Sequence, residues 1–424
     1  MSSIKIFLII WLGQLTSLAG SQITSFALGI WVYRTTGSVT QFALISFFVA
    51  LPSLIISPIA GALVDRWDRR WVIIISDSVA GLSTFFIALL VLTDQLQIWH
   101  VYLAITVSSI SSVFHWPAYN SSITLLADKR HLGRVNGMAQ LSEALAQLLA
   151  PICGGFLLVL IQLRGVVLLD MATFLFAVLT LLVVKFPKPK VTVTEKLGKG
   201  SLLQESIYGW RYINERPGLV GLLLFFTATN FTVYTSEVLV TPLVLSFAST
   251  KVLGIVLSIG GSGMLVGSIV MSIWGGPKRQ IYNILGSQFL LGICIFLVGM
   301  RSSAILITAG SFMAFFTIPF FQGSSNAIWQ SKVALDVQGR VFAIRRMFTW
   351  SSRPLAYLMA GPLADKIFEP LMSIKGPLSG SIGHIIGTGP GRGIGLMFMV
   401  MGALTALATI IAYQYDPLRL VEEK

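Results

Sequence analysis

Long apolar runs follow one another along almost the whole chain, and they constrain its fold more than any other feature. A helix that crosses a membrane needs about 20 mainly apolar residues. Twelve runs of that length are present, at residues 6–33, 38–64, 71–93, 98–126, 132–160, 165–185, 217–247, 252–275, 280–300, 302–329, 338–362 and 392–414. With 55% hydrophobic and only 11% charged residues, a water-soluble fold could not bury this much apolar surface. We therefore predict an all-α membrane protein with 12 transmembrane helices.

The charge of the chain fits the same interpretation. A net charge of +13 would suggest nucleic-acid binding in a soluble protein. In a membrane protein, Lys and Arg collect in cytoplasmic loops instead. Most of them share one side of the membrane when the N-terminus is placed on that side, so both termini are predicted to be cytoplasmic. We expect the lipid bilayer as a partner and no nucleic acid.

The first apolar run is predicted to be a membrane helix rather than a cleaved signal peptide. It is far longer than the apolar core of a signal, and no small-residue cleavage site follows it. The two cysteines, Cys153 and Cys294, both lie inside apolar runs. They offer neither a disulfide framework nor the spacing of a metal site, so we expect no metal and no cofactor.

One long polar stretch divides the predicted helices six and six. We predict an N-terminal six-helix bundle at 1–185, a cytoplasmic linker at 186–216 and a C-terminal six-helix bundle at 217–424. Within the linker, residues 201–214 have the pattern of an amphipathic helix on the membrane surface. The glycine-rich loop at 376–393 is not preceded by a strand, so it is expected to be a flexible external connection rather than a phosphate-binding loop.

The two halves repeat one another. When the chain is shifted by about 206 residues, the Gly-Arg-Val at 133–135 falls on the Gly-Arg-Val at 339–341, and Asn120 falls on Asn326. A repeat of six spans preserves the membrane orientation, so the two bundles are predicted to be parallel repeats. In transporters built this way, the substrate site lies between the halves.

A charged turn and two apolar segments carry a family resemblance. The turn at 61–70, Gly-Ala-Leu-Val-Asp-Arg-Trp-Asp-Arg-Arg, resembles the major facilitator motif between spans two and three, with Asp68 where the motif usually has glycine. The segments Phe-His-Trp-Pro-Ala at 114–118 and Ala-Pro-Ile-Cys-Gly-Gly at 150–155 are similar to those of its drug:proton antiporter branch, which includes macrolide efflux proteins and the enterobactin exporter.

This resemblance implies a function. The chain would be a secondary active transporter that exports an amphipathic or hydrophobic small molecule (a drug, macrolide-like compound, siderophore or other secondary metabolite) by alternating access in exchange for protons. It would act as a monomer in the bacterial plasma (inner) membrane. An uncoupled facilitator or importer of a small metabolite is the alternative. An integral-membrane enzyme that modifies lipids is a remote one, because the acids are dispersed rather than clustered at one interface.

The resemblance also implies an inner gate at the charged turn. Asp65 and Arg69 would help to latch the halves together, and Asp128 would supply a partner to the basic group. The residues of this gate motif are Gly61, Asp65, Arg66, Arg69, Arg70 and Asp128. Exposed pairs of this kind are weak, which suits a latch that opens in each cycle. The alternative is a charged turn that only fixes topology.

Four acids fall inside the predicted spans, where a charged side chain costs about 2.5–3.5 kcal/mol at the helix centre. Asp77 and Asp170 lie nearer the ends of their spans, so they are expected to reach headgroups or water. Glu143 lies near the middle of its run and is the first candidate for proton coupling. Glu237 is the second, with a packing role left open.

Polar residues share one helix face with Glu143. Asn136, Gln140, Gln147 and Pro151 follow helical spacing around it, so this face should meet protein or a water-filled path rather than lipid. A proton site is one interpretation of the face. A hydrogen-bonded seam between helices and a contact with the substrate are the others.

Similar stripes on other runs supply candidates for the substrate cavity. They are Gln14, Ser21, His115, Tyr119, Gln140, Gln147, Asn230, Tyr234, Arg346 and Arg353. For His115, a role in helix packing remains open. Arg353 lies well inside its span and needs a nearby carboxylate, carbonyl or water. Its partner could be an anionic substrate group or a structural acid, or the side chain could extend toward the inner face.

Overall fold

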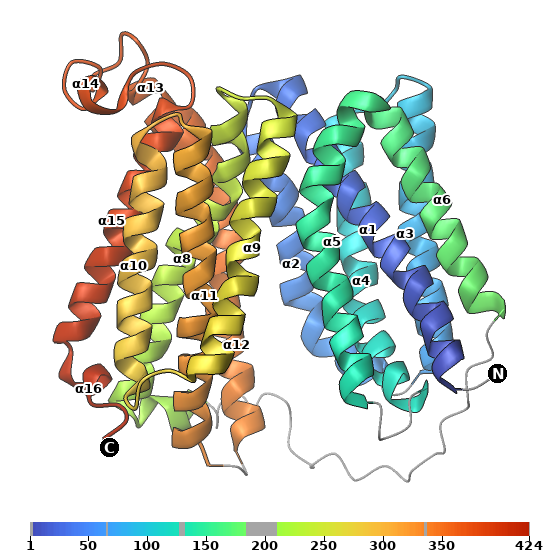
Figure 1. The fold of residues 1–424 in the computed structure, drawn as a ribbon, viewed down its shortest axis with the longest axis horizontal. Coiled ribbons are helices and arrows are strands. Elements are labelled where there is room, and N and C mark those ends of the chain that lie inside the picture. The colour runs from blue at the N-terminus through green and yellow to red at the C-terminus, as the bar shows by residue number, and fades with distance from the viewer. Residues whose placement is uncertain (1–2, 65–66, 127–131, 184–209, 335–336, 424) are drawn as a thin grey trace. The chain divides into compact units, whose positions relative to one another are not determined.

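The computed structural model describes residues 3–64, 67–126, 132–183, 210–334 and 337–423, and all of its regular elements are helices. Contacts divide the chain into two compact units, Met1–Val193 and Thr194–Lys424. In the first unit, six long helices run alongside one another (Figure 1). They are α1 (Ser3–Thr36), α2 (Val39–Val64), α3 (Arg69–Leu92), α4 (Ile98–Leu126), α5 (Leu132–Leu160) and α6 (Gln162–Val183).

The second unit also has six long helices. They are α8 (Pro217–Leu245), α9 (Thr250–Trp274), α10 (Gln280–Met300), α11 (Ala304–Lys332), α12 (Gln338–Leu363) and α15 (Arg392–Gln414). Every predicted boundary lies within about three residues of an observed helix end, because apolar runs of spanning length specify the helices directly. The described part of the predicted linker helix, residues 210–214, is helical.

Eleven of these helices are long and apolar enough to cross a membrane. The exception among the 12 is α12, which carries Arg345, Arg346 and Arg353 along its length. Its length of 26 residues is that of a spanning helix. Arginines within such a helix are expected to face protein or water rather than lipid.

Local sequence signals mark where several helices begin and end. The Ser249 hydroxyl accepts a hydrogen bond from the Val252 amide at the start of α9. At the other end of α9, Gly275 takes a left-handed conformation with φ of 72°, which glycine adopts without a steric penalty. Ser303 caps α11 in the same way as Ser249 caps α9. These caps supply hydrogen-bond partners to backbone groups that a helix end would leave open.

The repeat seen in the sequence is present in the packing of both units. In the first unit α1 packs on α5 and α6, α4 packs on α2 and α3, and α3 packs on α6. In the second unit α8 packs on α12 and α15, α11 packs on α9 and α10, and α10 packs on α15. Each of these pairings in one unit has its counterpart in the other. The 206-residue shift carries the ends of α4, Ile98 and Leu126, onto the ends of α11, Ala304 and Lys332.

Close approach of helices depends on glycine at particular crossings. A Cβ at Gly263 of α9 would lie 2.1 Å from the Phe312 carbonyl oxygen of α11. One at Gly267 would lie 2.3 Å from the Phe316 carbonyl oxygen, one turn further along the same crossing. Small residues at such spacing let membrane helices pack backbone against backbone, where dispersion contacts replace the hydrophobic effect as the driving force.

The loop between α12 and α15 differs from the expected flexible connection, because it is folded. It contains a π-helical turn (Ala364–Phe368) and the short helices α13 (Glu369–Leu371) and α14 (Gly383–Ile386). Met372 and Ile386 of the loop form a small buried cluster with Leu396 of α15. The Glu369 carboxylate accepts hydrogen bonds from the amides of Gly391 and Ile394, which ties the loop to the start of α15.

Candidate functional site

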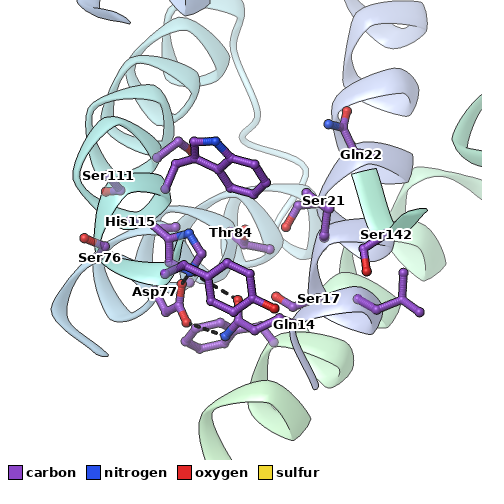
Figure 2. Close-up of a pocket in the computed structure, with 18 of the residues that line it drawn as sticks. Gln14, Ser17, Ser21, Gln22, Ser76, Asp77, Thr84, Ser111, His115 and Ser142 are labelled. Carbon is purple, nitrogen blue, oxygen red and sulfur yellow. Dashed lines mark hydrogen bonds and ion pairs between the residues drawn. The ribbon is translucent and has the colours of Figure 1, made fainter. Parts of the chain in front are cut away.

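The first unit contains a cavity of about 340 Å³ that lies among its membrane helices. Side chains from α1, α3, α4, α5 and α6 line it, and Figure 2 shows Gln14, Asp77 and His115 directed toward one another. The polar residues of its wall are Gln14, Ser17, Ser21, Gln22, Ser76, Asp77, Thr84, Ser111, Ser112, His115, Tyr119, Ser142 and Glu143. Ionisable side chains such as Asp77 and Glu143 are rare inside a membrane bundle, which makes this cavity a candidate path for a polar group or water.

A hydrogen-bonded network of three side chains from three helices lies in this cavity. The Gln14 side-chain amide donates to Oδ2 of Asp77 over 3.0 Å, and Nε2 of His115 lies 3.3 Å from Oδ1 of the same carboxylate. The same His115 nitrogen lies 3.1 Å from the side-chain oxygen of Gln14 (Figure 2). Both neighbours of Nε2 are hydrogen-bond acceptors, so the tautomer with a hydrogen on Nε2 satisfies these contacts.

Aromatic rings extend this network along α4. The ring of His115 stacks on Tyr119 with centroids 5.7 Å apart and planes 14° apart. The ring centroids of Trp116 and Tyr119 lie 6.3 Å apart, and both residues line the cavity. Such rings offer an apolar face beside polar groups, which is the combination that holds amphipathic ligands.

Asp170 of α6 is buried beside the cavity, with only 2% of the residue exposed. The Ser21 hydroxyl donates to its Oδ1 over 3.1 Å, and the Thr84 hydroxyl lies 3.5 Å from its Oδ2. The expectation that Asp170 and Asp77 reach headgroups or water is therefore wrong for Asp170, which is sequestered among hydroxyl groups of α1 and α3. Asp77 has a side chain that is 18% exposed and lines the cavity, so for this acid the expectation stays a prediction.

The polar face of α5 enters the cavity only in part. Glu143 and Ser142 line it. Gln147 is exposed and is not part of the wall. The side chains of Asn136 and Gln140 lie outside the described residues. The choice of Glu143 as a candidate for proton coupling stays a prediction, now with a defined cavity beside it.

The second unit has its own polar cluster, built by α8 and α12. Nε of Arg353 donates to the Tyr357 hydroxyl over 3.0 Å, and this hydroxyl lies 3.4 Å from the Glu237 carboxylate. An ion pair of 3.9 Å joins Arg353 to Glu237, and Tyr234 lies with its ring 5.1 Å from the guanidinium. Arg353 therefore has a carboxylate partner within the protein, and the role of that carboxylate stays a prediction. Because both side chains are nearly half exposed, at 47% and 45%, the pair adds little stability.

The remaining candidates of the second unit lie apart from this cluster. Asn230 donates from its side-chain amide to the backbone carbonyl of Thr349 over 3.3 Å, so it joins α8 to α12. Arg346 lines a separate cavity of about 330 Å³ beside α11. Within the second unit, Arg346 and Arg353 therefore belong to different clusters.

The gate motif lies largely beyond what the structure describes. Asp65, Arg66 and Asp128 are outside the described residues, as are the side chains of Arg69 and Arg70 and the surroundings of Gly61. The described part of the turn includes Trp67, whose ring stacks on Phe114 of α4 at 6.2 Å. The proposed latch stays a prediction.

No group of three His, Cys, Asp or Glu side chains that could hold a metal ion occurs among the residues that the structure describes. Sequence reasoning did not anticipate the hydrogen-bonded network around Asp77, the burial of Asp170, or the contacts of Arg345 and Tyr357. The available signal was that every ionisable residue in a span is a candidate by default. Asp77 and Asp170 were not chosen as candidates because they lie nearer the ends of their predicted spans than Glu143 does.

Comparison with known proteins agrees with this architecture. The Major Facilitator Superfamily model matches residues 10–357. Macrolide efflux protein A of Streptococcus pyogenes is 26% identical over 367 residues, covering 85% of this chain and 90% of that protein. The multidrug efflux pump Tap of Mycolicibacterium fortuitum is 22% identical over 364 residues, covering 84% and 89%. These relatives confirm the resemblance to drug exporters.

Solved structures share the fold. A bacterial homologue of the human lysosomal transporter Spinster, crystallised in an inward-facing and unoccupied conformation, has a TM-score of 0.69 at 14% identity and covers 96% of this chain and 97% of that one. The nucleoside transporter NupG has a TM-score of 0.67 at 15% identity, covering 97% and 99%. Together with the matched family model and the repeated six-helix units, these likenesses show that the chain is a multi-pass membrane transporter, not an enzyme, and that it belongs to the Major Facilitator Superfamily.

Proposed function

We propose that this transporter exports an amphipathic or hydrophobic small molecule by alternating access, in exchange for protons. The observation that carries the proposal is the cavity of the first unit, where Asp77, His115 and Glu143 share a wall with aromatic rings. Relatives named as macrolide and multidrug exporters support the substrate class. Aromatic faces suit an apolar ligand, and ionisable groups in the same space allow proton and ligand to compete.

The chemistry of the exchange follows from the Asp77 network. When the Asp77 carboxylate is ionised, it accepts from both Gln14 and His115. A proton on Asp77 removes one acceptor and the negative charge, so the network must rearrange. Glu143, on the wall formed by α5, is the second acid of the proposed pathway. A carrier that can load either a proton or its cargo, but not both, converts a pH gradient into export.

We place both termini in the cytoplasm of a bacterial cell and assign the work to a monomer. Lys and Arg content supports this orientation. In the proposed cycle, bundles 1–185 and 217–424 move as bodies about the linker 186–216. The turn containing Asp65 and Arg69 serves as the inner latch, with Asp128 as its partner. Glu237 acts as a second proton or substrate group within the cluster around Arg353.

Reconstitution tests the proposal directly. The purified protein is placed in liposomes with an imposed pH gradient, and transport of a radiolabelled macrolide is followed with and without the gradient. Export coupled to protons predicts accumulation that collapses when the gradient is dissipated. Glu143→Gln is expected to lower gradient-driven accumulation at least tenfold while leaving the protein folded, about the effect of removing one group that acts in proton transfer.

Two results would count against parts of this proposal. Accumulation that Glu143→Gln leaves unchanged would remove Glu143 from the pathway. Transport of the macrolide that only equilibrates, with no response to the pH gradient, would identify an uncoupled facilitator instead. A panel of other amphipathic compounds, run alongside the macrolide, separates a wrong substrate from an inactive preparation.

A further inference from the structure

A second cavity, of about 330 Å³, lies between α11 and α12 within the second unit. Its wall differs in charge from the cavity of the first unit. Two adjacent arginines, Arg345 and Arg346, line it, and no carboxylate belongs to the wall among the residues that the structure describes. Nothing in the proposed exchange of protons requires these two cations.

Arg345 is held in a fixed position. Its Nη2 donates to the Ser325 hydroxyl over 3.0 Å, and its guanidinium lies 5.3 Å from the ring centroid of Trp329. Ser325 and Trp329 are each only 1% exposed, so the surroundings that position the arginine are part of the core. One bond to a hydroxyl leaves most of the five guanidinium donors available to a ligand.

Arg346 is exposed and adds a second guanidinium at the cavity. It lies 5.6 Å from the ring centroid of Trp350, which also lines the space. The side-chain amides of Asn326 and Gln330 supply further donors from α11. The wall thus offers donors on two helices beside one aromatic face.

Two like charges on neighbouring residues repel each other, and the repulsion grows where protein and lipid displace water. Arg353 on the same helix has the carboxylate of Glu237 as a partner. The wall around Arg345 and Arg346 supplies hydroxyl, amide and aromatic groups instead. An anion in the cavity would relieve the repulsion, and the planar fork of arginine matches the oxygens of carboxylate and phosphate groups.

The repeat shows that this charge is specific to the second half. A shift of about 206 residues carries Gln140 onto Arg346 and Glu143 onto Thr349. The Thr349 hydroxyl donates to the backbone carbonyl of Arg345 over 2.9 Å, so its hydrogen is used within α12. The first unit therefore presents an acid to its cavity, whereas the equivalent helix of the second unit presents cations.

We propose that the cavity between α11 and α12 binds the oxyanion of an amphipathic molecule, a carboxylate or phosphate group, with the apolar part of that molecule against Trp350. Such a group could be supplied by a small solute that enters the cavity or by the headgroup of an anionic lipid. The shared chemistry is the oxyanion on the arginine pair. This inference goes beyond the proposed proton exchange and does not depend on it.

Calorimetric titration of the purified full-length protein in a neutral detergent tests the site. Inorganic phosphate probes a free anion, and dioctanoyl phosphatidylglycerol probes an anionic headgroup. Dioctanoyl phosphatidylcholine, in which a cation accompanies the phosphate, controls for binding of the acyl chains. Saturable binding of phosphate alone indicates a solute site, and binding of the phosphatidylglycerol alone indicates a lipid site, and either supports the proposal.

Variants tie the binding to the arginines. Arg346→Gln is expected to weaken binding at least tenfold, because it removes a charged donor from an exposed position without disturbing the core. Arg345→Gln should have a similar effect on binding. If Arg345→Gln does not fold, the result for Arg346→Gln alone tests the proposal. Arg301→Gln is the matched control, since Arg301 is an exposed arginine at the end of α10 and outside the cavity wall.

Three results would overturn the proposal. They are the absence of saturable binding of either anionic probe to the wild-type protein, equal binding of the two phospholipids, and binding by Arg346→Gln that matches the wild type. None of these measurements involves transport. A protein that fails to export the macrolide can still pass this test, and a working exporter can fail it.

Discussion

Asp77 of α3 and His115 of α4 meet through a contact of 3.3 Å between Oδ1 and Nε2. Gln14 of α1 contacts both of them, so the three helices are joined at one point inside the bundle. The contact is an ion pair only when the histidine is protonated, and a hydrogen bond otherwise. Its strength therefore changes with the protonation state of either partner, which is the property that a coupling element needs.

The first prediction concerns this pair. Asp77→Asn keeps the shape of the side chain but removes its charge, so gradient-driven accumulation of the macrolide in liposomes should fall at least tenfold. His115→Gln should have the same direction of effect. If the two residues act together, the double variant should be no worse than Asp77→Asn alone, because the second change removes an interaction that is already lost.

Asp94→Asn is the control for this experiment. Asp94 pairs with Arg164 on an exposed turn, and its side chain is 80% exposed. Loss of such a pair changes stability by less than about 1 kcal/mol, and transport should be close to that of the wild type. Full gradient-driven transport by Asp77→Asn would exclude the pair from the coupling mechanism.

The second prediction concerns Asp170, which accepts from Ser21 and is approached by Thr84. An uncharged acceptor can replace the carboxylate at this buried position, so Asp170→Asn should unfold in detergent at a temperature no lower than that of the wild type. Asp170→Ala leaves the hydroxyl groups without their acceptor and should cost about 1–3 kcal/mol. If both variants were equally destabilised, the negative charge itself would be required at this position.

The helices could be predicted from the sequence because their cause is local. Each run of apolar residues is long enough to span the membrane by itself, and a helix is the form in which one such segment satisfies its own backbone hydrogen bonds in lipid. The correspondence between α4 and α11 also follows from the sequence, since residues 133–135 and 339–341 fix the register of the two halves. The folded loop around Glu369 could not be predicted from the sequence. Its contacts join Glu369 to Gly391 and Ile394, and a glycine-rich composition does not show which residues of a loop will meet.

The candidate site was only partly predictable, for the opposite reason. Helical spacing places Glu143 and Gln147 on one face of α5, but the spacing does not show where the cavity ends along that face. The network around Asp77 joins residues from three helices, and no pattern within one helix encodes such a meeting. Asp170 was misjudged because distance along a helix is a poor measure of burial when another helix crosses it.

The third prediction concerns the crossing of α9 and α11. Gly263→Ala places a methyl group where only 2.1 Å separates the Cβ position from the Phe312 carbonyl oxygen, so the helices must move apart. A change of this kind typically costs about 1–3 kcal/mol. Gly286→Ala in α10 is the matched control, since a Cβ there meets nothing within 4 Å. Thermal denaturation in detergent should show destabilisation in the first variant and no loss in the second.

One outcome of this comparison would contradict the prediction for Gly263. If Gly263→Ala and Gly286→Ala unfold at the same temperature, then close backbone contact between α9 and α11 does not contribute to stability. The control should gain slightly, by about 0.5–1 kcal/mol, because alanine favours the helix over glycine. If Gly286→Ala were itself destabilised, the added methyl group would disturb a contact of α10 beyond the 4 Å around the Cβ position.

The fourth prediction concerns Glu369, whose carboxylate accepts from the backbone amides of Gly391 and Ile394 over 3.2 and 3.0 Å. Burial raises the pKa of Glu369 above its ordinary value of 4.5, although the two hydrogen bonds oppose part of this rise. A raised pKa in the folded state means that the folded protein holds the proton more tightly than the unfolded chain does. The stabilisation is then fully present below pH 4.5 and is lost as the pH rises through the folded-state pKa.

Denaturation in detergent across a pH series measures this effect. The unfolding temperature of the wild type should contain a component that declines as the pH rises above about 4.5, and Glu369→Gln should lack that component because it cannot ionise. Glu215→Gln is the control, since the Glu215 side chain is 59% exposed and pairs with Arg211, four residues earlier. If Glu369→Gln and Glu215→Gln kept the same pH dependence as the wild type, the acid that joins the loop to α15 would not be linked to folding. In that case the two backbone hydrogen bonds would fully offset the cost of burying the Glu369 charge.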